Sequence, residues 1–307
     1  MINLFQLENY NIDTSIFSNL LHDKVVTEFE ESFASYVGAK YSCTINSATN
    51  AIFLLFLNRN ITVNVPSMIP PVVLNALITS GNKINFIDDT NWIGGSYILH
   101  DFGDYKVIDS AQRVDKDQFK NEANPNDIMF FSHYPTKPVG SCDGGTIVSN
   151  DYNKIKWIKE AVMNGMSFAE NNWDRVIKFP GYKMYMNSIQ CYIANENLKK
   201  IDNNKLSLMK IRNYYNERLN LSNTSDHLYR IMVDDNKKFV EYMKKFGITC
   251  GIHYSCQHTN SIYNRGVKFN CTHSEEISSK TVSIPFHTNL NDMNIDLIVN
   301  KIIDYGK

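Results

Sequence analysis

Residues Lys40–Asn58 read KYSCTINSATNAIFLLFLN. The first part, KYSCTI, is typical of a short strand because β-branched and aromatic residues dominate it. Ser47 is a preferred residue for a helix start, and the apolar run after it predicts a buried helix. A strand followed within a few residues by a helix is the start of an α/β arrangement.

The same alternation continues on both sides of this stretch. Helices are predicted over residues 23–39, 70–81 and 151–165, and strands over 62–66, 83–88, 105–110 and 127–132. Strands that alternate with helices predict a parallel sheet with helices on its faces. Residues 144–150, GGTIVSN, predict an edge or antiparallel strand after a Gly-Gly turn. We therefore expect an α/β fold built on a mainly parallel sheet.

The pattern changes to α+β from about His227. Strands are predicted over 227–233, 248–254 and 280–286, with helices over 235–247 and 291–305. We expect a large cofactor-binding domain over residues 1–195. A linking helix and a small C-terminal α+β domain are expected over 196–307.

Composition restricts the class of partner. The 307 residues carry 31 basic and 32 acidic side chains, and no basic block is present, which argues against nucleic acid as a partner. Six cysteines without a CxxC motif predict reduced thiols and a cytoplasmic protein. The N-terminus lacks the pattern of a signal peptide, and the longest apolar run, Ala51–Leu57, is too short to span a bilayer.

Polar residues stand where the predicted strands end, which is where open parallel sheets bind ligands. Ser47 and Thr49 begin a helix whose N–H groups suit a phosphate, although Ser47 is equally an ordinary helix cap. Asp109 ends the strand of VIDSAQ (107–112), where it is either a partner for a cationic ring nitrogen or a cap. Ser132 ends a third strand.

Lys137 lies in FFSHYPTKPVGSCDGG (130–145), between Pro135 and Pro138 and before a glycine pair. A long cationic side chain on so constrained a backbone predicts an amine held against a bound group. A phosphate cradle, a carboxylate, a hydroxyl and a restrained lysine together indicate pyridoxal phosphate. That cofactor has a phosphate, a pyridine nitrogen that an acid keeps protonated, and an aldehyde that condenses with lysine.

In this order, the motifs resemble the DegT family of pyridoxal-phosphate sugar aminotransferases, which have the aspartate-aminotransferase fold. The resemblance runs nearly end to end. The segments that carry it are VVTEFEESFASYVGAKYSCTINSATNAI (25–52), VIDSAQ (107–112), FSHYPTK (131–137) with DGG (143–145), GIHY (251–254) and VSIPFH (282–287).

The resemblance implies roles for individual residues. Lys137 would carry the cofactor and move the proton, Asp109 would pair with the ring nitrogen, and Gln112 would contact the ring face or its 3-hydroxyl. The phosphate would be held by Ala48, Thr49 and Ser132. The resemblance also implies transfer of an amino group from glutamate to a nucleotide-linked keto sugar, in a homodimer that shares its active site.

The chain departs from the family pattern at three places. No aromatic residue lies near Pro70, where the family stacks one on the cofactor ring. Lys183 and Tyr185 stand where the family has an asparagine and then an arginine that serve the neighbouring subunit, and Lys183 could still reach a phosphate there. The segment 91–105 is much shorter than in typical members.

Two alternatives stay open. A sugar dehydratase on the same scaffold would replace the cofactor lysine by histidine, which Lys137 argues against. A catalytically degenerate protein with a binding or regulatory role is favoured by the missing aromatic residue and the short chain. His253, Cys256 and His258 have metal-like spacing without an evident fourth ligand, so we expect no metal site.

Overall fold

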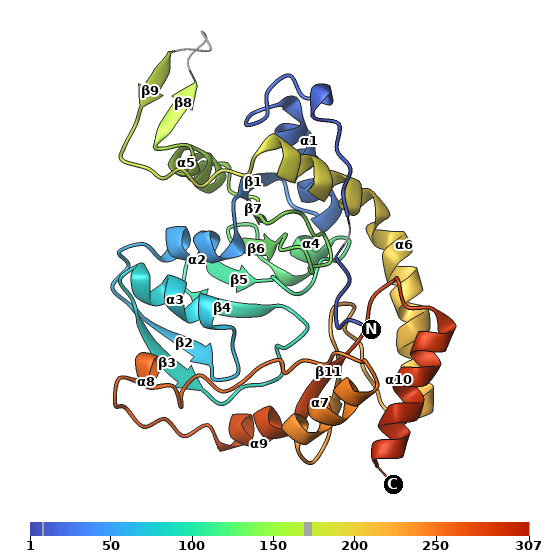
Figure 1. Ribbon diagram of the computed structural model, residues 1–307. Coiled ribbons are helices and arrows are strands. Elements are labelled where there is room, and N and C mark those ends of the chain that lie inside the picture. The colour runs from blue at the N-terminus through green and yellow to red at the C-terminus, as the bar shows by residue number, and fades with distance from the viewer. Residues whose placement is uncertain (8, 169–173, 307) are drawn as a thin grey trace. The chain divides into compact units, whose positions relative to one another are not determined.

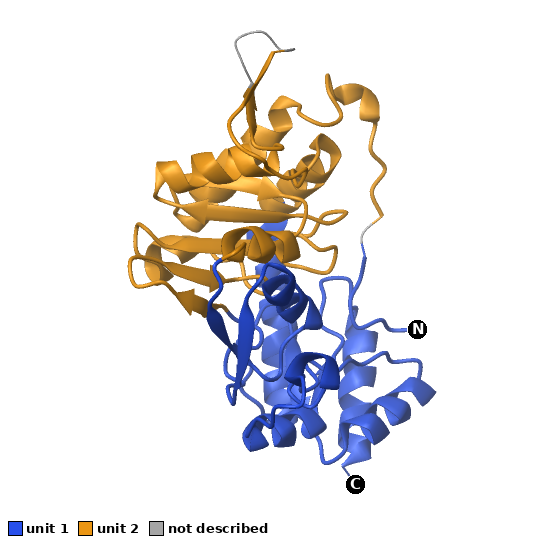
Figure 2. Cartoon of the chain, turned by 90° about the vertical axis from the view of Figure 1, so that its left-hand side faces the viewer, with its two compact units in different colours: residues 1–7, 59–95, 200–307 blue, residues 8–58, 96–199 orange. Residues whose placement is uncertain are grey.

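The computed structural model describes residues 1–7, 9–168 and 174–306. The chain forms two compact units, each made of separate stretches of sequence (Figure 2). Unit 1 comprises Met1–Leu7, Arg59–Gly95 and Lys200–Lys307, and unit 2 comprises Glu8–Asn58 and Ser96–Lys199. The long helix α6, Ser188–Leu219, contributes to both units. The predicted division into domains 1–195 and 196–307 stays a prediction.

Unit 2 is built on a five-stranded sheet in the order β1-β7-β6-β5-β4 (Figure 1). Its strands are β1 Tyr41–Ile45, β4 Tyr97–Asp101, β5 Lys106–Asp109, β6 Ile128–Ser132 and β7 Gly145–Ser149. The α/β class is confirmed, but the sheet is mixed and not mainly parallel. Only β5 and β6 run parallel, whereas the β1–β7, β6–β7 and β4–β5 pairs are antiparallel.

The lengths of the connections explain these strand directions. A parallel pair needs a crossover connection, usually a helix, whereas antiparallel strands can be joined directly. Residues 102–105 join β4 to β5, and the helix-free segment 133–144 joins β6 to β7, so both pairs are antiparallel. The connection from β5 to β6 contains a helix, α4 (Gln118–Glu122), and that pair is parallel.

Helices cover the sheet of unit 2. Helix α1, Lys24–Val37, begins after Asp23, whose carboxylate accepts a hydrogen bond from the Val25 N–H, and ends at Gly38 with a φ of 76°. Helices α1 and α5 (Tyr152–Val162) pack against β1, while α2 (Ala48–Phe56) packs against β6 and β7. The short helix η1, Thr14–Ile16, and the hairpin β8–β9, Met166–Phe168 and Arg175–Ile177, complete unit 2.

Unit 1 contains two small sheets. Strands β2 (Thr62–Pro66) and β3 (Lys83–Ile87) are parallel and joined through α3 (Pro71–Thr79). Strands β10 (Tyr229–Met232) and β11 (Thr281–Ile284) are antiparallel. The helices are α7 Asn236–Lys245, α8 Ser261–Asn264, α9 Thr272–Lys280 and α10 Asp292–Tyr305.

The strand predicted over 248–254 is wrong. Ile248 bridges Ile2 and Gly251 bridges Ser283, so the segment has two different partners and forms no continuous ladder with either.

None of the described helices is long and apolar enough to cross a membrane. All six cysteines are free thiols.

Candidate active site

The sheet register of unit 2 brings the predicted strand-end residues to one edge of the sheet. Asp109 at the end of β5 pairs with Phe130 of β6, and Ser132 at the end of β6 pairs with Gly145 of β7. Gly145 also pairs with Ile45, the last residue of β1. The ends of β1, β5 and β6 therefore lie together, although β7 runs in the opposite direction.

The start of helix α2 lies at this edge and can hold an anion. Ser47 caps the helix by accepting a hydrogen bond from the Asn50 N–H at 3.1 Å, so the capping interpretation is correct. The cap leaves the N–H groups of Ala48 and Thr49 pointing out of the first turn, where a helix has no internal acceptor for them. A Cβ on Gly145 would lie 3.0 Å from the Ala48 nitrogen, so glycine is required for β7 to approach this turn.

Ser132 completes this candidate phosphate site from the end of β6. Its side chain is buried, and its Oγ accepts a hydrogen bond from the Tyr134 N–H at 3.3 Å. The hydroxyl hydrogen of Ser132 therefore stays available for an acceptor such as a phosphate oxygen.

Lys137 lies on the tight loop between β6 and β7. Its N–H donates to the Tyr134 carbonyl at 2.8 Å, and a Cβ on Gly140 would lie 2.5 Å from the Pro135 carbonyl oxygen. The side chain is partly buried, and burial lowers the pKa of its amine to about 8, although the nearby Asp109 carboxylate opposes the shift. The loop thus holds a lysine whose amine is far easier to deprotonate than usual.

His133 fixes this loop and was missed by the sequence analysis. The ring is fully buried, with Nδ1 2.8 Å from the Val139 carbonyl oxygen and Nε2 2.7 Å from the Thr146 hydroxyl. Burial lowers the pKa of His133 to about 4, so the ring is neutral, and Nδ1 must carry the hydrogen because a carbonyl can only accept. The His133 backbone also bonds the Gly144 carbonyl and the Ser141 N–H, so one residue holds both ends of the loop.

Asp109 is buried and held by two hydrogen bonds. One carboxylate oxygen accepts from the Ala111 N–H at 2.9 Å, and the other accepts from the Tyr97 hydroxyl at 3.1 Å. Burial raises the pKa of Asp109, while these two bonds and the charge of Lys137 act against the rise. Tyr97 stands directly opposite Asp109 in the β4–β5 pair, and the sequence analysis missed it because it did not predict β4.

Of the remaining predicted site residues, Gln112 is buried and Lys183 is exposed. Gln112 is buried three residues beyond Asp109. Lys183 is exposed, with its ammonium 6.0 Å from the centre of the Tyr185 ring. The next residue, Met184, accepts a hydrogen bond from the Asn46 N–H at 2.7 Å, so this segment runs beside the loop that leads into α2.

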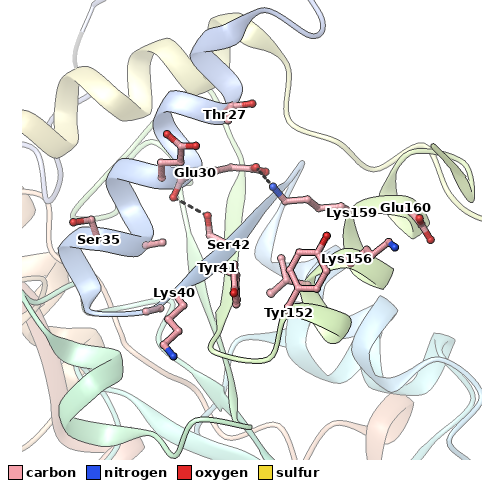
Figure 3. Close-up of a pocket in the computed structure, with 14 residues that line it drawn as sticks. Thr27, Glu30, Ser35, Lys40, Tyr41, Ser42, Tyr152, Lys156, Lys159 and Glu160 are labelled. Carbon is pink, nitrogen blue, oxygen red and sulfur yellow. Dashed lines mark hydrogen bonds and ion pairs between the residues drawn. The ribbon is translucent and has the colours of Figure 1, made fainter. Parts of the chain in front are cut away.

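A cavity of about 660 Å³ between α1, β1 and α5 contains none of the predicted site residues (Figure 3). Its buried Glu30 accepts from the Thr44 N–H at 2.7 Å and pairs with Lys159 at 2.5 Å. These bonds cover the free edge of β1, which is a structural role.

His253 and His258 are engaged in other contacts. His253 Nδ1 lies 2.9 Å from the Ser283 hydroxyl, and His258 lies between the Ser67 hydroxyl and Glu275. Among the residues that the structure describes, no group of three or more metal-ligating side chains could hold a metal ion.

A family model matches most of the chain. The family model described as the DegT/DnrJ/EryC1/StrS aminotransferase family matches residues 11–91 and 109–303. The unmatched segment between them contains β4 and Tyr97.

Sequence and structure relatives extend over most of the chain. A UDP-4-amino-4,6-dideoxy-N-acetyl-beta-L-altrosamine transaminase of Campylobacter jejuni is 25% identical, over 87% of this chain and 86% of the relative. The aminotransferase TlmJ of Streptoalloteichus hindustanus superimposes with a TM-score of 0.84 at 18% identity, covering 98% of both chains. The Helicobacter pylori aminotransferase PseC does so with a TM-score of 0.80 at 19% identity, again covering 98% of both chains.

Proposed function

Because the chain belongs to the DegT/DnrJ/EryC1/StrS aminotransferase family, whose members use pyridoxal phosphate, we propose that it transfers an amino group from glutamate to a nucleotide-linked keto sugar. The observation that carries the proposal is a desolvated lysine, Lys137, near enough to a buried carboxylate, Asp109, for their charges to interact, at the sheet edge where α2 begins. The Campylobacter jejuni relative, named for a UDP-linked amino sugar, supports a nucleotide-linked acceptor.

The residues of unit 2 fit the cofactor. The N–H groups of Ala48 and Thr49 and the hydroxyl of Ser132 would hold its phosphate, and Asp109 would hold a proton on its ring nitrogen. Gln112 would contact the ring. Bound there, pyridoxal phosphate would supply the aldehyde that takes up the amino group and the ring that withdraws electrons.

Lys137 is proposed to act as both nucleophile and proton carrier. A neutral amine is required for attack on the aldehyde, and burial has already lowered its pKa to about 8. With the cofactor and the amino donor bound, the neutral Lys137 Nζ would take up and hold the proton that leaves the α carbon of the donor. His133 keeps the loop in place, and Tyr97 keeps the Asp109 carboxylate oriented.

A spectroscopic experiment tests the proposed function. The purified protein with pyridoxal phosphate should show a visible absorption band that L-glutamate removes and that a nucleotide-linked keto sugar restores. A protein that binds the cofactor but shows no change with any amino donor would support the degenerate binding protein. Release of a deoxygenated sugar without amine transfer would support the dehydratase, which the retained Lys137 disfavours.

The rate at which the apo-protein takes up the cofactor should depend on pH through Lys137. Only the neutral amine reacts, so the rate should rise with pH around a midpoint of about 8, well below the ordinary lysine value of 10.5. Rapid-mixing absorbance measurements from pH 6 to pH 10 would give the midpoint. A midpoint near the ordinary value would show that Lys137 is not desolvated in solution.

We further propose that the protein is a cytoplasmic homodimer in which Lys183 reaches the cofactor phosphate of the neighbouring subunit. The exposure of Lys183 is compatible with that role. Loss of one charge-assisted contact weakens binding by roughly 1.5–3 kcal/mol, so Lys183→Ala should bind the cofactor about ten- to a hundredfold more weakly.

Mixing subunits tests whether Lys183 acts across the interface. Lys183→Ala and Lys137→Ala chains should each be weak or inactive alone. If the two residues serve sites of different chains, a mixed dimer has one intact site, and activity should return towards half that of wild type. No gain on mixing would place Lys183 in its own chain's site, and unchanged cofactor affinity in Lys183→Ala would remove it from either site.

A further inference from the structure

The Tyr97–Asp109 pair lies at the open end of the β4–β5 ladder. Tyr97 is the first residue of β4, Asp109 is the last residue of β5, and the two are register partners. Pairing between these two strands therefore ends here and does not hold the chain that precedes Tyr97 or follows Asp109. The neighbouring residues are Ser96 and Ser110, and each forms a hydrogen bond with a side chain of the short helix α4.

Gln118, the first residue of α4, holds the turn that follows β5. It is 1% exposed, and its Nε2 donates to the Ser110 hydroxyl oxygen at 2.7 Å. The Ser110 hydroxyl hydrogen is not needed for this bond, since it donates to the Arg113 carbonyl at 2.8 Å. Oε1 of Gln118 accepts from the Asp115 N–H at 2.9 Å, and this bond fixes which end of the amide is oxygen, because a backbone N–H can only donate. One buried amide therefore joins the first and last parts of the turn.

Glu122, the last residue of α4, holds the chain just before β4. Its Oε2 accepts from the Ser96 hydroxyl at 2.6 Å, and its Oε1 pairs with the Arg113 guanidinium at 2.6 Å. Gln118 and Glu122 are four residues apart, so they lie on the same face of the helix. A hydrogen bond of 3.4 Å from the Gln118 Nε2 to the Glu122 Oε2 joins them. One face of α4 thus contacts both strands at the open end of their ladder.

We propose that Gln118 and Glu122 are positioning residues, which hold the Asp109 carboxylate in place for the ring nitrogen of the cofactor. The inference rests on the proposed function, in which Asp109 keeps that nitrogen protonated. The carboxylate accepts from the Ala111 N–H and from the Tyr97 hydroxyl, and α4 holds the segments that carry these two donors. Both bonds favour the ionised carboxylate, so releasing either segment would leave Asp109 a poorer partner for a protonated nitrogen.

NMR of the ring nitrogen, isotopically labelled in the bound pyridoxal phosphate, tests the proposal without using turnover. Gln118→Met keeps the length of the side chain but removes its hydrogen bonds, and Ser96→Ala removes a single hydroxyl. Asn121→Ala is the matched control because Asn121 is an exposed residue of the same helix. The pH at which half of the ring nitrogen is protonated should fall by about one unit in Gln118→Met, the equivalent of about one hydrogen bond to a charged group. It should fall less in Ser96→Ala and not at all in Asn121→Ala.

Single-turnover rates with L-glutamate in two backgrounds separate positioning from folding. In the otherwise wild-type protein, Gln118→Met should slow the reaction about tenfold. In Asp109→Asn it should slow the reaction little further, because the charge that α4 positions is already lost. Equal slowing in both backgrounds, or a nitrogen midpoint that moves in neither Gln118→Met nor Ser96→Ala, would overturn the proposal, and Ser96→Ala alone decides if Gln118→Met does not fold. Failure of wild type to accept an amino group from glutamate would instead overturn the proposed function, whatever the nitrogen midpoints show.

Discussion

We expect Lys137→Ala to abolish transamination while the protein keeps its fold and still binds pyridoxamine phosphate. The substitution removes both the amine that joins the cofactor and the group that moves the proton. Positioned proton transfer alone contributes up to about 10⁴-fold to a rate, so turnover should fall by at least about four orders of magnitude. The fold should survive because the lost side chain lies on a loop and is only partly buried, and His133 continues to hold the loop.

Three measurements on Lys137→Ala check this expectation. Single-turnover absorbance with L-glutamate should show no reaction, the melting temperature should match that of wild type, and calorimetry should give near-normal affinity for pyridoxamine phosphate. Lys116→Ala is a suitable control because Lys116 is an exposed lysine of the same unit. Normal transamination by Lys137→Ala would end the aminotransferase proposal.

The local elements of the fold could be predicted because local sequence determines them. The helix predicted over 23–39 is α1, Lys24–Val37, since an apolar stripe, the Asp23 cap and Gly38 define it locally. The direction of an individual strand was predicted only for residues 144–150, where β7 is antiparallel to both of its neighbours as expected. For the other strands it depends on whether a connection contains a helix. Strand β4 was missed because it is an edge strand with an exposed Ile98 and a register shift beside it, so its apolar pattern is weak.

In the candidate site, too, residues in local motifs could be predicted and residues that depend on tertiary contacts could not. Asp109, Ser132 and Lys137 could be proposed from the sequence because each ends or follows a strand in a recognisable motif. Tyr97 reaches the Asp109 carboxylate only because β4 pairs with β5. His133 holds the loop that carries Lys137 only because its ring lies close to the Val139 carbonyl. Neither contact can be predicted from a local sequence pattern. Residues that position others were therefore harder to predict than those expected to touch the cofactor.

Asp109→Asn should slow proton transfer far more than it weakens substrate binding. The carboxylate is the group that would keep the ring nitrogen protonated, and an amide of the same size cannot supply that charge. Removing one preorganised electrostatic partner typically lowers a rate about 10²- to 10³-fold, and we expect the single-turnover rate with L-glutamate to fall by that amount. The donor concentration that gives half the maximal rate should change little, because Asp109 is proposed to contact the cofactor and not the donor.

The choice of asparagine separates chemistry from folding. The amide oxygen can still accept from the Ala111 N–H, so the local backbone should keep its conformation. The melting temperature of Asp109→Asn should therefore stay close to that of wild type. The one altered contact is the hydrogen bond from the Tyr97 hydroxyl. A normal single-turnover rate in this variant would show that Asp109 only caps the turn at Ala111.

Tyr97→Phe provides the matched comparison for Asp109→Asn, since it keeps the carboxylate and removes only one of its hydrogen bonds. The lost bond to the charged carboxylate favoured its ionised form, so the pKa of Asp109 should rise in Tyr97→Phe. The rate should fall by about tenfold, the lower end of the range for a hydrogen bond to a charged group. The loss should be smaller at high pH, where the carboxylate ionises again, whereas Asp109→Asn should stay slow at every pH. This difference in pH dependence would show that Tyr97 acts through the charge of Asp109 and not through packing.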